Sequence, residues 1–255
     1  MPRKKKYSFP MISVFGTIGV IGSIIGIIWC SFLWAKACGT LAIDEIVIRG
    51  ATILNIDQYQ RHIGDLTNNK PIQTNLLDIQ RIVEEHPYIK AARVSHQYPS
   101  IIVIEISERK PIAILNGEPM VMLDSDGVVL PDIGNLIDFS IPILTNYNPA
   151  PELYPIGNRA LSVKVMESIS WLKILRRNYQ ELYYNLSEMT MENGGEIVLI
   201  LADYPTRVVL GNSHSWSKIE ILKKFQQKIK GENLLSDFTY LDMRYKNQVI
   251  VKERI

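Results

Sequence analysis

Cysteine is nearly absent from this chain of 255 residues. The first of its two cysteines, Cys30, lies inside a long apolar run, and the second, Cys38, follows that run closely. The two are poorly placed to bridge each other, and the sequence contains no further cysteine. The chain beyond residue 42 must therefore be stabilised by an ordinary hydrophobic core rather than by disulfides.

Metal-binding motifs are also missing. The histidines do not form H-x-x-x-H or H-E-x-x-H pairs, and neither cysteine is placed to complete a zinc site. The four histidines are His62, His86, His96 and His214. Asp124-Ser125-Asp126-Gly127 lacks the later ligands of a calcium loop, so it predicts a hairpin turn instead.

Catalytic signatures are equally scarce. The sequence has no P-loop, no G-x-G-x-x-G fingerprint and no G-x-S-x-G nucleophile elbow. A nucleophile, a base and a charge stabiliser are not recognisable together. We therefore predict a protein that is not an enzyme, with no catalytic residue, no cofactor and no metal.

Charge is missing between Lys6 and Lys36. A helix needs about 20 residues to cross the roughly 30 Å hydrocarbon layer, and this run is longer. Trp29 and Trp34 lie toward its far end, where indole rings favour the headgroup level. The pattern predicts a tail over residues 1–8 and a transmembrane helix over residues 9–36.

A cleaved signal peptide is the alternative interpretation of this segment. Ala35-Lys36-Ala37 resembles an A-x-A cleavage site, and Cys38 follows it as a lipoprotein cysteine would. However, the apolar run is longer than the 7–15 residues of a signal's apolar region, and lysine fits poorly just before the bond. An uncleaved anchor is therefore favoured.

The distribution of basic residues predicts the orientation. Arg3–Lys6 precede the helix, so the tail is expected to be cytoplasmic and the chain from about Lys36 onward to be exported. The exported part has 23 basic and 26 acidic residues, a formal net charge of −3. This balance gives no basic domain for nucleic acid.

Three glycines lie on one face of the expected helix: Gly19, Gly22 and Gly26. The spacing of Gly22 and Gly26 is that of a G-x-x-x-G helix-packing motif. Glycine is also common in membrane helices without any packing role. Both interpretations stay open.

The exported part predicts two modules. Residues 42–110 have a βααββ pattern, with Asn55 and Asn75 as helix caps, Gly64 as the end of the first helix and a turn at Pro99-Ser100. The expected elements are a strand at 43–50, helices at 55–63 and 75–87, and strands at 94–98 and 101–108.

Residues 111–255 predict a mainly antiparallel β-domain with flanking helices. The expected elements are a hairpin of 120–123 and 128–130, a strand at 141–144, a helix at 163–177, a hairpin of 186–192 and 196–201 around Asn193-Gly194, a strand at 207–211, a helix at 216–229 that ends before Gly231, and a long strand at 238–252.

Several motifs occur together in a familiar order. They are HPYIKAARVSHQYP at 86–99, IEISERKPIA at 104–113, MLDSDGVV at 122–129, IPIL at 141–144, RVVLG at 207–211 and YLDMRYKNQV at 240–249. With the anchor, they resemble the FtsQ/DivIB family of bacterial cell-division proteins over nearly the whole chain. The resemblance implies an α+β chain with a single transmembrane helix, a POTRA domain at 42–110 and a β-domain at 111–255. The short cytoplasmic tail departs from the family pattern.

The expected C-terminal strand alternates clearly. One face contains Leu241, Met243, Tyr245, Val249 and Val251, and the other contains Tyr240, Asp242, Arg244, Lys246 and Gln248. A terminal strand can expose unpaired backbone groups that invite a partner strand, although an internal structural strand has the same pattern.

The family resemblance favours the partner-binding interpretation. In FtsQ proteins the end of the β-domain receives FtsB by strand addition, with an Arg-Tyr segment in the contact, and Arg244-Tyr245 matches that segment. The implied contributions are main-chain pairing, packing of Tyr245 and ion pairing of Arg244. The candidate partner-binding residues are Tyr240, Asp242, Arg244, Tyr245, Asn247 and Val249.

The leading hypothesis is a non-catalytic bitopic scaffold of the divisome in the inner membrane at the septum, with its C-terminal modules in the periplasm. Its implied partners are FtsB, FtsL and the lipid bilayer, with no nucleic acid and no small-molecule substrate. One alternative is a membrane-anchored POTRA protein of outer-membrane transport or secretion, although 145 residues after the POTRA-like module leave little room for a barrel. Another is a membrane-anchored hydrolase, which the missing catalytic constellation disfavours.

Overall fold

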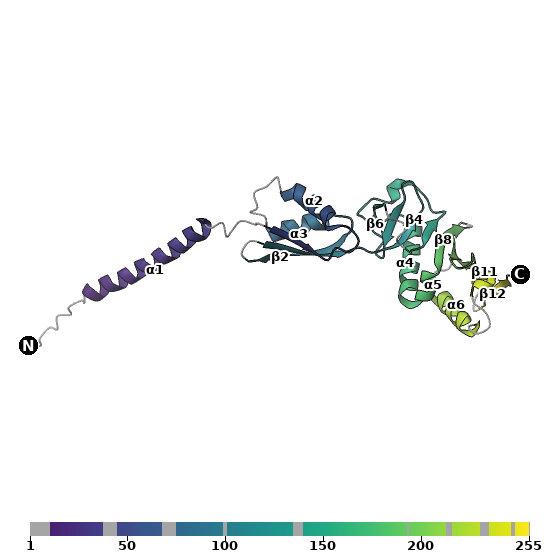
Figure 1. Ribbon diagram of the computed structural model, residues 1–255. Coiled ribbons are helices and arrows are strands. Elements are labelled where there is room, and N and C mark those ends of the chain that lie inside the picture. Colours follow the sequence, from purple (N-terminus) through teal and green to yellow (C-terminus); the bar gives the residue numbers. More distant parts are fainter. Residues whose placement is uncertain are drawn as a thin grey trace, which may run out of the picture.

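The computed structural model describes residues 11–37, 45–67, 75–98, 101–134, 140–192, 194–212, 216–229, 235–245 and 248–254. Within these residues the chain has an apolar helix, a three-stranded sheet with two helices, and a nine-stranded sheet with further helices (Figure 1). This arrangement confirms the α+β fold class expected from the sequence.

Helix α1 (Met11–Ala37) is the N-terminal apolar helix. Its segment Gly16–Trp34 is long and apolar enough to cross a membrane, and within the described chain it is the one helix of that kind. Its side chains from Gly16 to Trp34 are exposed. The helix matches the expected anchor segment by length and composition.

The first module has the expected βααββ order. Its elements are β1 (Glu45–Arg49), α2 (Ile56–Thr67), α3 (Leu76–Glu84), β2 (Ile89–Gln97) and β3 (Ile101–Glu108). The strand order is β1-β3-β2, with β1 parallel and β2 antiparallel to the central strand. Both helices cover one face of this sheet, because Tyr59 and Val83 share a buried cluster with Ile102, Ile104 and Ile106.

Several boundaries in this module differ from expectation, and one is the end of α3, which lies at Glu84 rather than at Pro87. Helix α2 does not stop at Gly64 but runs on to Thr67, because a glycine inside a helix costs only about 1 kcal/mol and does not break the backbone ladder. Strand β2 begins at Ile89 rather than Val94, because its first half pairs with the C-terminal half of β3. The Asn75 cap is confirmed by its side chain, which accepts a hydrogen bond from the Leu77 N–H. The expected turn at Pro99-Ser100 lies outside the described residues.

The second module contains the remaining elements. They are β4 (Pro111–Leu115), β5 (Val121–Asp124), β6 (Val129–Leu130), β7 (Ile143–Thr145), the 3₁₀ turn η2 (Pro151–Leu153), α4 (Val163–Asn178), α5 (Gln180–Tyr184), β8 (Leu186–Glu192), β9 (Glu196–Leu201), β10 (Arg207–Gly211), α6 (Trp216–Ile229), the 3₁₀ turn η3 (Leu235–Asp237), β11 (Phe238–Asp242) and β12 (Ile250–Glu253). Strand β4 and helix α5 have no counterpart in the sequence-based expectation.

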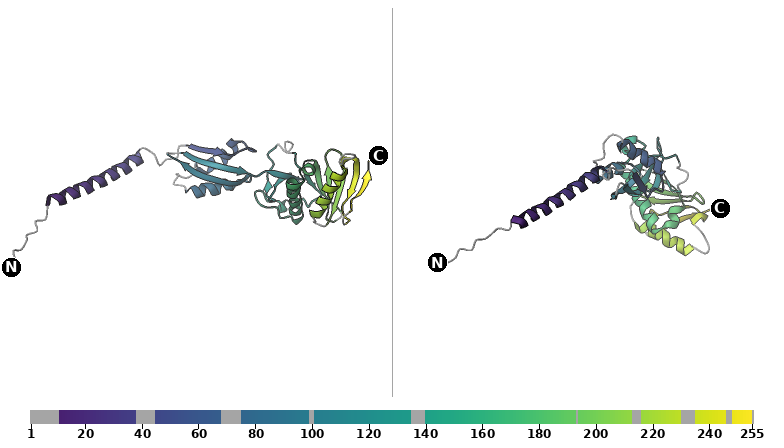
Figure 2. Two further views of the ribbon diagram at one scale, coloured as in Figure 1. Left: turned by 90° about the horizontal axis from the view of Figure 1, so that it is seen from below. Right: turned by 60° about the vertical axis from the view of Figure 1, so that its left-hand side comes forward.

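These strands form one sheet in the order β12-β11-β10-β9-β8-β7-β4-β5-β6. Among the described pairs, β4–β7, β7–β8 and β10–β11 are parallel and the other pairs are antiparallel. Figure 2 shows the yellow C-terminal strands at the end of the sheet that lies away from the first module.

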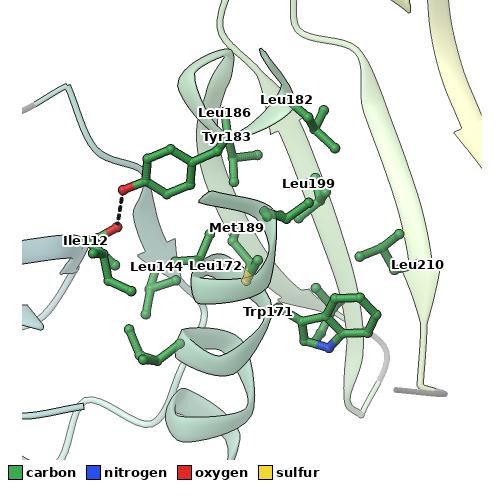
Figure 3. Close-up of a cluster of buried hydrophobic side chains, with 14 of the residues drawn as sticks. Ile112, Leu144, Trp171, Leu172, Leu182, Tyr183, Leu186, Met189, Leu199 and Leu210 are labelled. Carbon is green, nitrogen blue, oxygen red and sulfur yellow. Dashed lines mark hydrogen bonds between the residues drawn. The ribbon is translucent and has the colours of Figure 1, made fainter. Parts of the chain in front are cut away.

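Helix α4 fills the core of the second module. Trp171 and Leu172 are 5% and 0% exposed, and they lie over Met189 and Leu199 of the sheet (Figure 3). The buried Tyr183 hydroxyl donates a hydrogen bond to the Ile112 carbonyl oxygen at 3.1 Å, which ties α5 to β4. The sheet is therefore supported along the middle of its length.

The expected long strand at 238–252 is wrong. The chain instead forms a hairpin in which β11 and β12 pair antiparallel, with Leu241 opposite Val251. The chain leaves β11 after Asp242, whose side chain accepts a hydrogen bond from the Arg244 N–H at 3.0 Å. This local hydrogen bond competes with the backbone hydrogen bonds that would extend the strand. The alternation of apolar and polar residues does not reveal such a bond.

The two modules are packed against each other. Tyr88 is fully buried in a cluster with Ile114, Met122 and Leu130 of the second module. Its hydroxyl donates to the Pro131 carbonyl oxygen at 2.7 Å. This aromatic side chain thus fills the junction and satisfies its own polar tip.

Two aspartates of the β5–β6 turn add ion pairs to the junction. Arg109 Nη1 lies 2.9 Å from Asp124 Oδ2, and the Asp124 side chain is 3% exposed. Lys90 of β2 and Lys173 of α4 both bind Asp126, and their hydrogen bonds lower the pKa of that carboxyl to about 2. The backbone N–H of Val128 also donates to Asp124, so the hairpin turn expected here is confirmed.

Glu108, the last residue of β3, binds the loop after β1 close to this junction. Its carboxylate accepts hydrogen bonds from the N–H groups of Thr52, Ile53 and Leu54 and from the hydroxyls of Thr52 and Tyr59. Burial raises the pKa of Glu108, but these donors outweigh it, and the net effect is a lowered pKa. The loop after β1 is therefore organised around one charged side chain.

We expect Glu108→Gln to lower the free energy of unfolding of the first module by about 1–3 kcal/mol, because an amide donor then faces backbone donors in a buried site. Denaturant unfolding of the full chain measures this loss. Glu105→Gln, on the exposed side of the same strand, is the matched control and should change stability by less than about 0.5 kcal/mol. The depressed pKa stabilises the fold above the ordinary value of 4.5, so the wild type should lose this contribution as the pH falls below that value, whereas the glutamine variant should not.

We expect Tyr88→Ala to loosen the junction between the modules, since it empties a buried site and removes the bond to Pro131. Limited proteolysis near residues 108–111 should become at least about tenfold faster, because local opening exposes that backbone. Tyr98→Ala, at the other end of β2 and 79% exposed, provides the control. Equal proteolysis of both variants would contradict the role of Tyr88.

Candidate functional site

The C-terminal hairpin places strand β12 at the edge of the sheet. Strand β12 pairs with β11 on one side, and no other strand of the described residues lies on its second side. All four of its residues are exposed. An exposed edge presents backbone N–H and C=O groups that another chain can pair with.

Apolar side chains surround this edge. Tyr245, Ile250 and Val251 are 54%, 47% and 37% exposed. Val249, immediately before β12, packs partly against the main core. The edge therefore combines backbone pairing groups with accessible apolar surface, which suits a protein partner.

The sequence-predicted residues fall in three different places. Tyr240 and Asp242 belong to β11, which is an interior strand between β10 and β12, and the Asp242 side chain is 5% exposed. Arg244 and Tyr245 lie in the connection that leads toward β12, and Val249 lies at its end. Asn247 lies outside the described residues. Tyr240 and Asp242 share a face of the strand, as the alternation predicts, and the Tyr240 hydroxyl donates to Asp242 Oδ2 at 3.0 Å, but their strand is not the edge of the sheet.

Arg244 is held by side chains of its own chain. Its Nε donates to both carboxylate oxygens of Asp242 at 3.0 and 3.1 Å, and its Nη2 donates to Asp242 Oδ2 at 2.6 Å. Its Nη1 lies 3.3 Å from Glu196 Oε1 at the start of β9, and Nη2 lies 3.4 Å from the Tyr240 hydroxyl oxygen. These contacts join β9, β11 and the connection.

The charges in this cluster shift one another's proton affinity. The Arg244 guanidinium holds the pKa of Asp242 below its usual range, and the Asp242 carboxylate raises the pKa of Arg244. Burial, followed by the hydrogen bond to Asp242, raises the pKa of Tyr240. The carboxylate and the guanidinium are therefore both charged at neutral pH.

The far end of β12 is anchored by a residue that the sequence analysis did not single out. The Arg254 N–H donates to the Asp237 carbonyl oxygen at 2.8 Å, and its Nε donates to the Ser236 carbonyl oxygen at 3.2 Å. The guanidinium also lies over the Tyr204 ring, 5.4 Å from its centroid. An arginine near a chain end has no local pattern that predicts such contacts.

The three glycines of the possible helix-packing face lie on α1. A Cβ added at Gly19, Gly22 or Gly26 would meet no described atom within 4 Å. The Ser23 hydroxyl donates to the Gly19 carbonyl oxygen at 3.0 Å, as serines in apolar helices commonly do. Pairing through this face stays a prediction.

Two other kinds of site would support chemistry among the described residues: a metal cluster and a cavity with catalytic side chains. No cluster of three or more His, Cys, Asp or Glu side chains among them could hold a metal ion. A cavity of about 420 Å³ lies between the α4–α5 junction and α6, and Tyr179, Glu181, Lys223 and Gln226 are among its lining residues. That lining contains no serine, cysteine or histidine to act as a nucleophile or base.

Two family models match the chain in sequence order. One is described as "POTRA domain, FtsQ-type" and matches residues 41–109, and the other is described as "Cell division protein FtsQ/DivIB, C-terminal" and matches residues 113–244. The second match alone covers half of the chain. Its last residue is Arg244, so Tyr245 and β12 lie beyond it.

Named relatives agree with these matches. The "Cell division protein FtsQ" of Geotalea daltonii is 24% identical over 70% of this chain, and that of Syntrophotalea carbinolica is 28% identical over 69%. The "Cell division protein FtsQ" of Koribacter versatilis is 22% identical over 82% of this chain. The alignments span 63%, 62% and 59% of the lengths of these three relatives, which is less than two thirds of each.

The βααββ module and the sheet that follows it, without β12, correspond to the two matched regions in order. The chain belongs to the FtsQ/DivIB family of cell-division proteins.

Proposed function

We propose that this chain is a non-catalytic membrane scaffold of the bacterial divisome, which links division proteins through its POTRA domain and its β-domain. The observation that supports this most directly is the exposed strand β12 at the edge of a sheet that packs on a buried core. A protein that connects partners needs accessible docking surfaces on a stable support, and this edge is such a surface.

The proposed partner at this edge is FtsB, which would add a strand beside β12. Main-chain pairing would supply much of the affinity, and Tyr245 would pack against the partner's side chains. Arg244 would contribute charge, since its side chain is 40% exposed although it is already bound on one side. FtsL is proposed to join the same assembly through FtsB.

The proposed topology places α1 in the inner membrane and both modules in the periplasm, at the division septum. The basic residues before the helix and the charge-free segment itself support this orientation. The two modules would then stand on one side of the membrane and reach the periplasmic parts of other division proteins.

A POTRA protein of outer-membrane transport is the weaker candidate. The second family match describes an FtsQ/DivIB C-terminal region rather than a transport domain, and its residues form the nine-stranded sheet except for β12. No specific contact in the described residues favours the transport function.

Depletion of this protein in its own organism tests the cellular role. We expect elongated filaments without septa, because a missing scaffold leaves later division proteins unassembled. Phase-contrast microscopy with a membrane stain measures cell length and septum frequency, and re-expression of the chain is the control. Normal division after depletion would refute the division role.

Tyr245→Ala tests the docking edge directly. Exposed aromatic anchors at interfaces contribute about 2 kcal/mol or more, so we expect the Kd for the periplasmic segment of FtsB to rise about 30-fold. Isothermal titration with the full chain in detergent gives this value. Tyr184→Ala, an exposed tyrosine on α5, is the matched control and should change the Kd by less than about twofold. Unchanged affinity in a folded Tyr245→Ala variant would overturn the contact.

A further inference from the structure

A cluster of charged side chains lies where the chain leaves β11 toward β12. The described acidic members are Asp242 and Glu196, and the basic members are Arg244 and Lys218. Lys218 of α6 is 9% exposed and donates to the Leu210 carbonyl oxygen. Two acids thus face two bases, so that the buried carboxylate of Asp242 does not lack a counter-charge.

The backbone beneath Arg244 is shaped for its side chain. Gly211 ends β10 with a positive φ of 74°, and a Cβ added there would lie 2.8 Å from Arg244 Cγ. Only glycine tolerates both the left-handed conformation and this close approach. The stem of Arg244 therefore lies across the end of β10 before its guanidinium reaches Asp242 and Glu196.

This arrangement fixes the start of the connection in three ways. The Met243 N–H donates to the Val209 carbonyl oxygen at 2.8 Å, the Arg244 N–H donates to Asp242 Oδ1 at 3.0 Å, and the Arg244 guanidinium closes the turn on the same carboxylate. Arg254 anchors the opposite end of β12. The chain is thus held at the start of the connection and directly after β12, although the residues of β12 are exposed.

We infer that Asp242 and Glu196 are positioning residues for partner binding, which act through Arg244 to hold the start of the β11–β12 connection and so favour the geometry of β12 that an incoming strand requires. The inference rests on the strand addition proposed above. Asp242 is too buried to touch a partner, so its effect on binding must pass through Arg244. Ordering the edge before binding lowers the entropy that association must offset.

Hydrogen–deuterium exchange of the full chain tests the positioning step without any partner. In Asp242→Asn we expect the amides of residues 250–253 to exchange about tenfold faster, because the connection opens more often. Asp124→Asn is the matched control, since it neutralises a similarly buried aspartate that binds an arginine far from this edge. Unchanged exchange in Asp242→Asn would overturn the inference.

A double-mutant cycle with the FtsB periplasmic segment tests the route through Arg244. Asp242→Asn should weaken binding about tenfold in the wild-type background and by less than about twofold in an Arg244→Gln background. Arg244→Lys should behave like Arg244→Gln, because lysine keeps the charge but cannot bind the carboxylate in two places. Equal losses in both backgrounds would show that Asp242 acts independently and would overturn the inference.

Glu196→Gln keeps the test informative if Asp242→Asn does not fold. It leaves the buried pair in place and should produce the same changes in exchange and binding at smaller size. If the wild type does not bind the FtsB segment while exchange at 250–253 still depends on Asp242, the proposed partner fails and the positioning of the edge stands.

Discussion

The backbone hydrogen bonds of one continuous sheet connect the junction with the first module to the exposed strand β12. Every open sheet has two edges, and in this sheet one edge is covered and the other is exposed. The β6 edge is bridged by Arg159 and Ile156 and lies beside the buried junction with the POTRA domain. The β12 edge has neither cover nor partner among the described residues. The sheet therefore has one edge covered by other parts of the fold and one edge whose residues are exposed.

Buried carboxylates bind the backbone at three places where the chain leaves a strand. Glu108 gathers the N–H groups of the loop after β1, Asp124 binds the β5–β6 turn and Arg109, and Asp242 binds Arg244 where the chain leaves β11. In each case the carboxylate is satisfied by several donors at once, which makes the local geometry unique and costly to disturb. Hydrophobic packing supports the modules, and these polar contacts set the direction in which the chain leaves them.

Periodicity predicted the elements that have one buried face. Helix α6 has the expected bounds, and α4 exceeds its expected end by one residue, because their apolar residues recur at helical spacing. Strand β4 was not predicted, because all five of its residues are buried and show no alternation. Helix α5 is a short segment of five residues whose burial depends on Leu182 and Tyr183 meeting the sheet. Elements of that kind have no pattern of their own to recognise.

The apolar segment, the order of the two modules and the family could all be predicted before the fold was known, because they follow from local composition and from motifs along the chain. It also named Arg244 and Tyr245 as candidate contacts. The folded chain alone shows that the C-terminal segment is a hairpin with β12 outermost, and that Arg244 binds both Asp242 and Glu196. The physical reason is that alternation assigns residues to the faces of a strand, whereas an edge and a charge cluster depend on segments far apart in the chain.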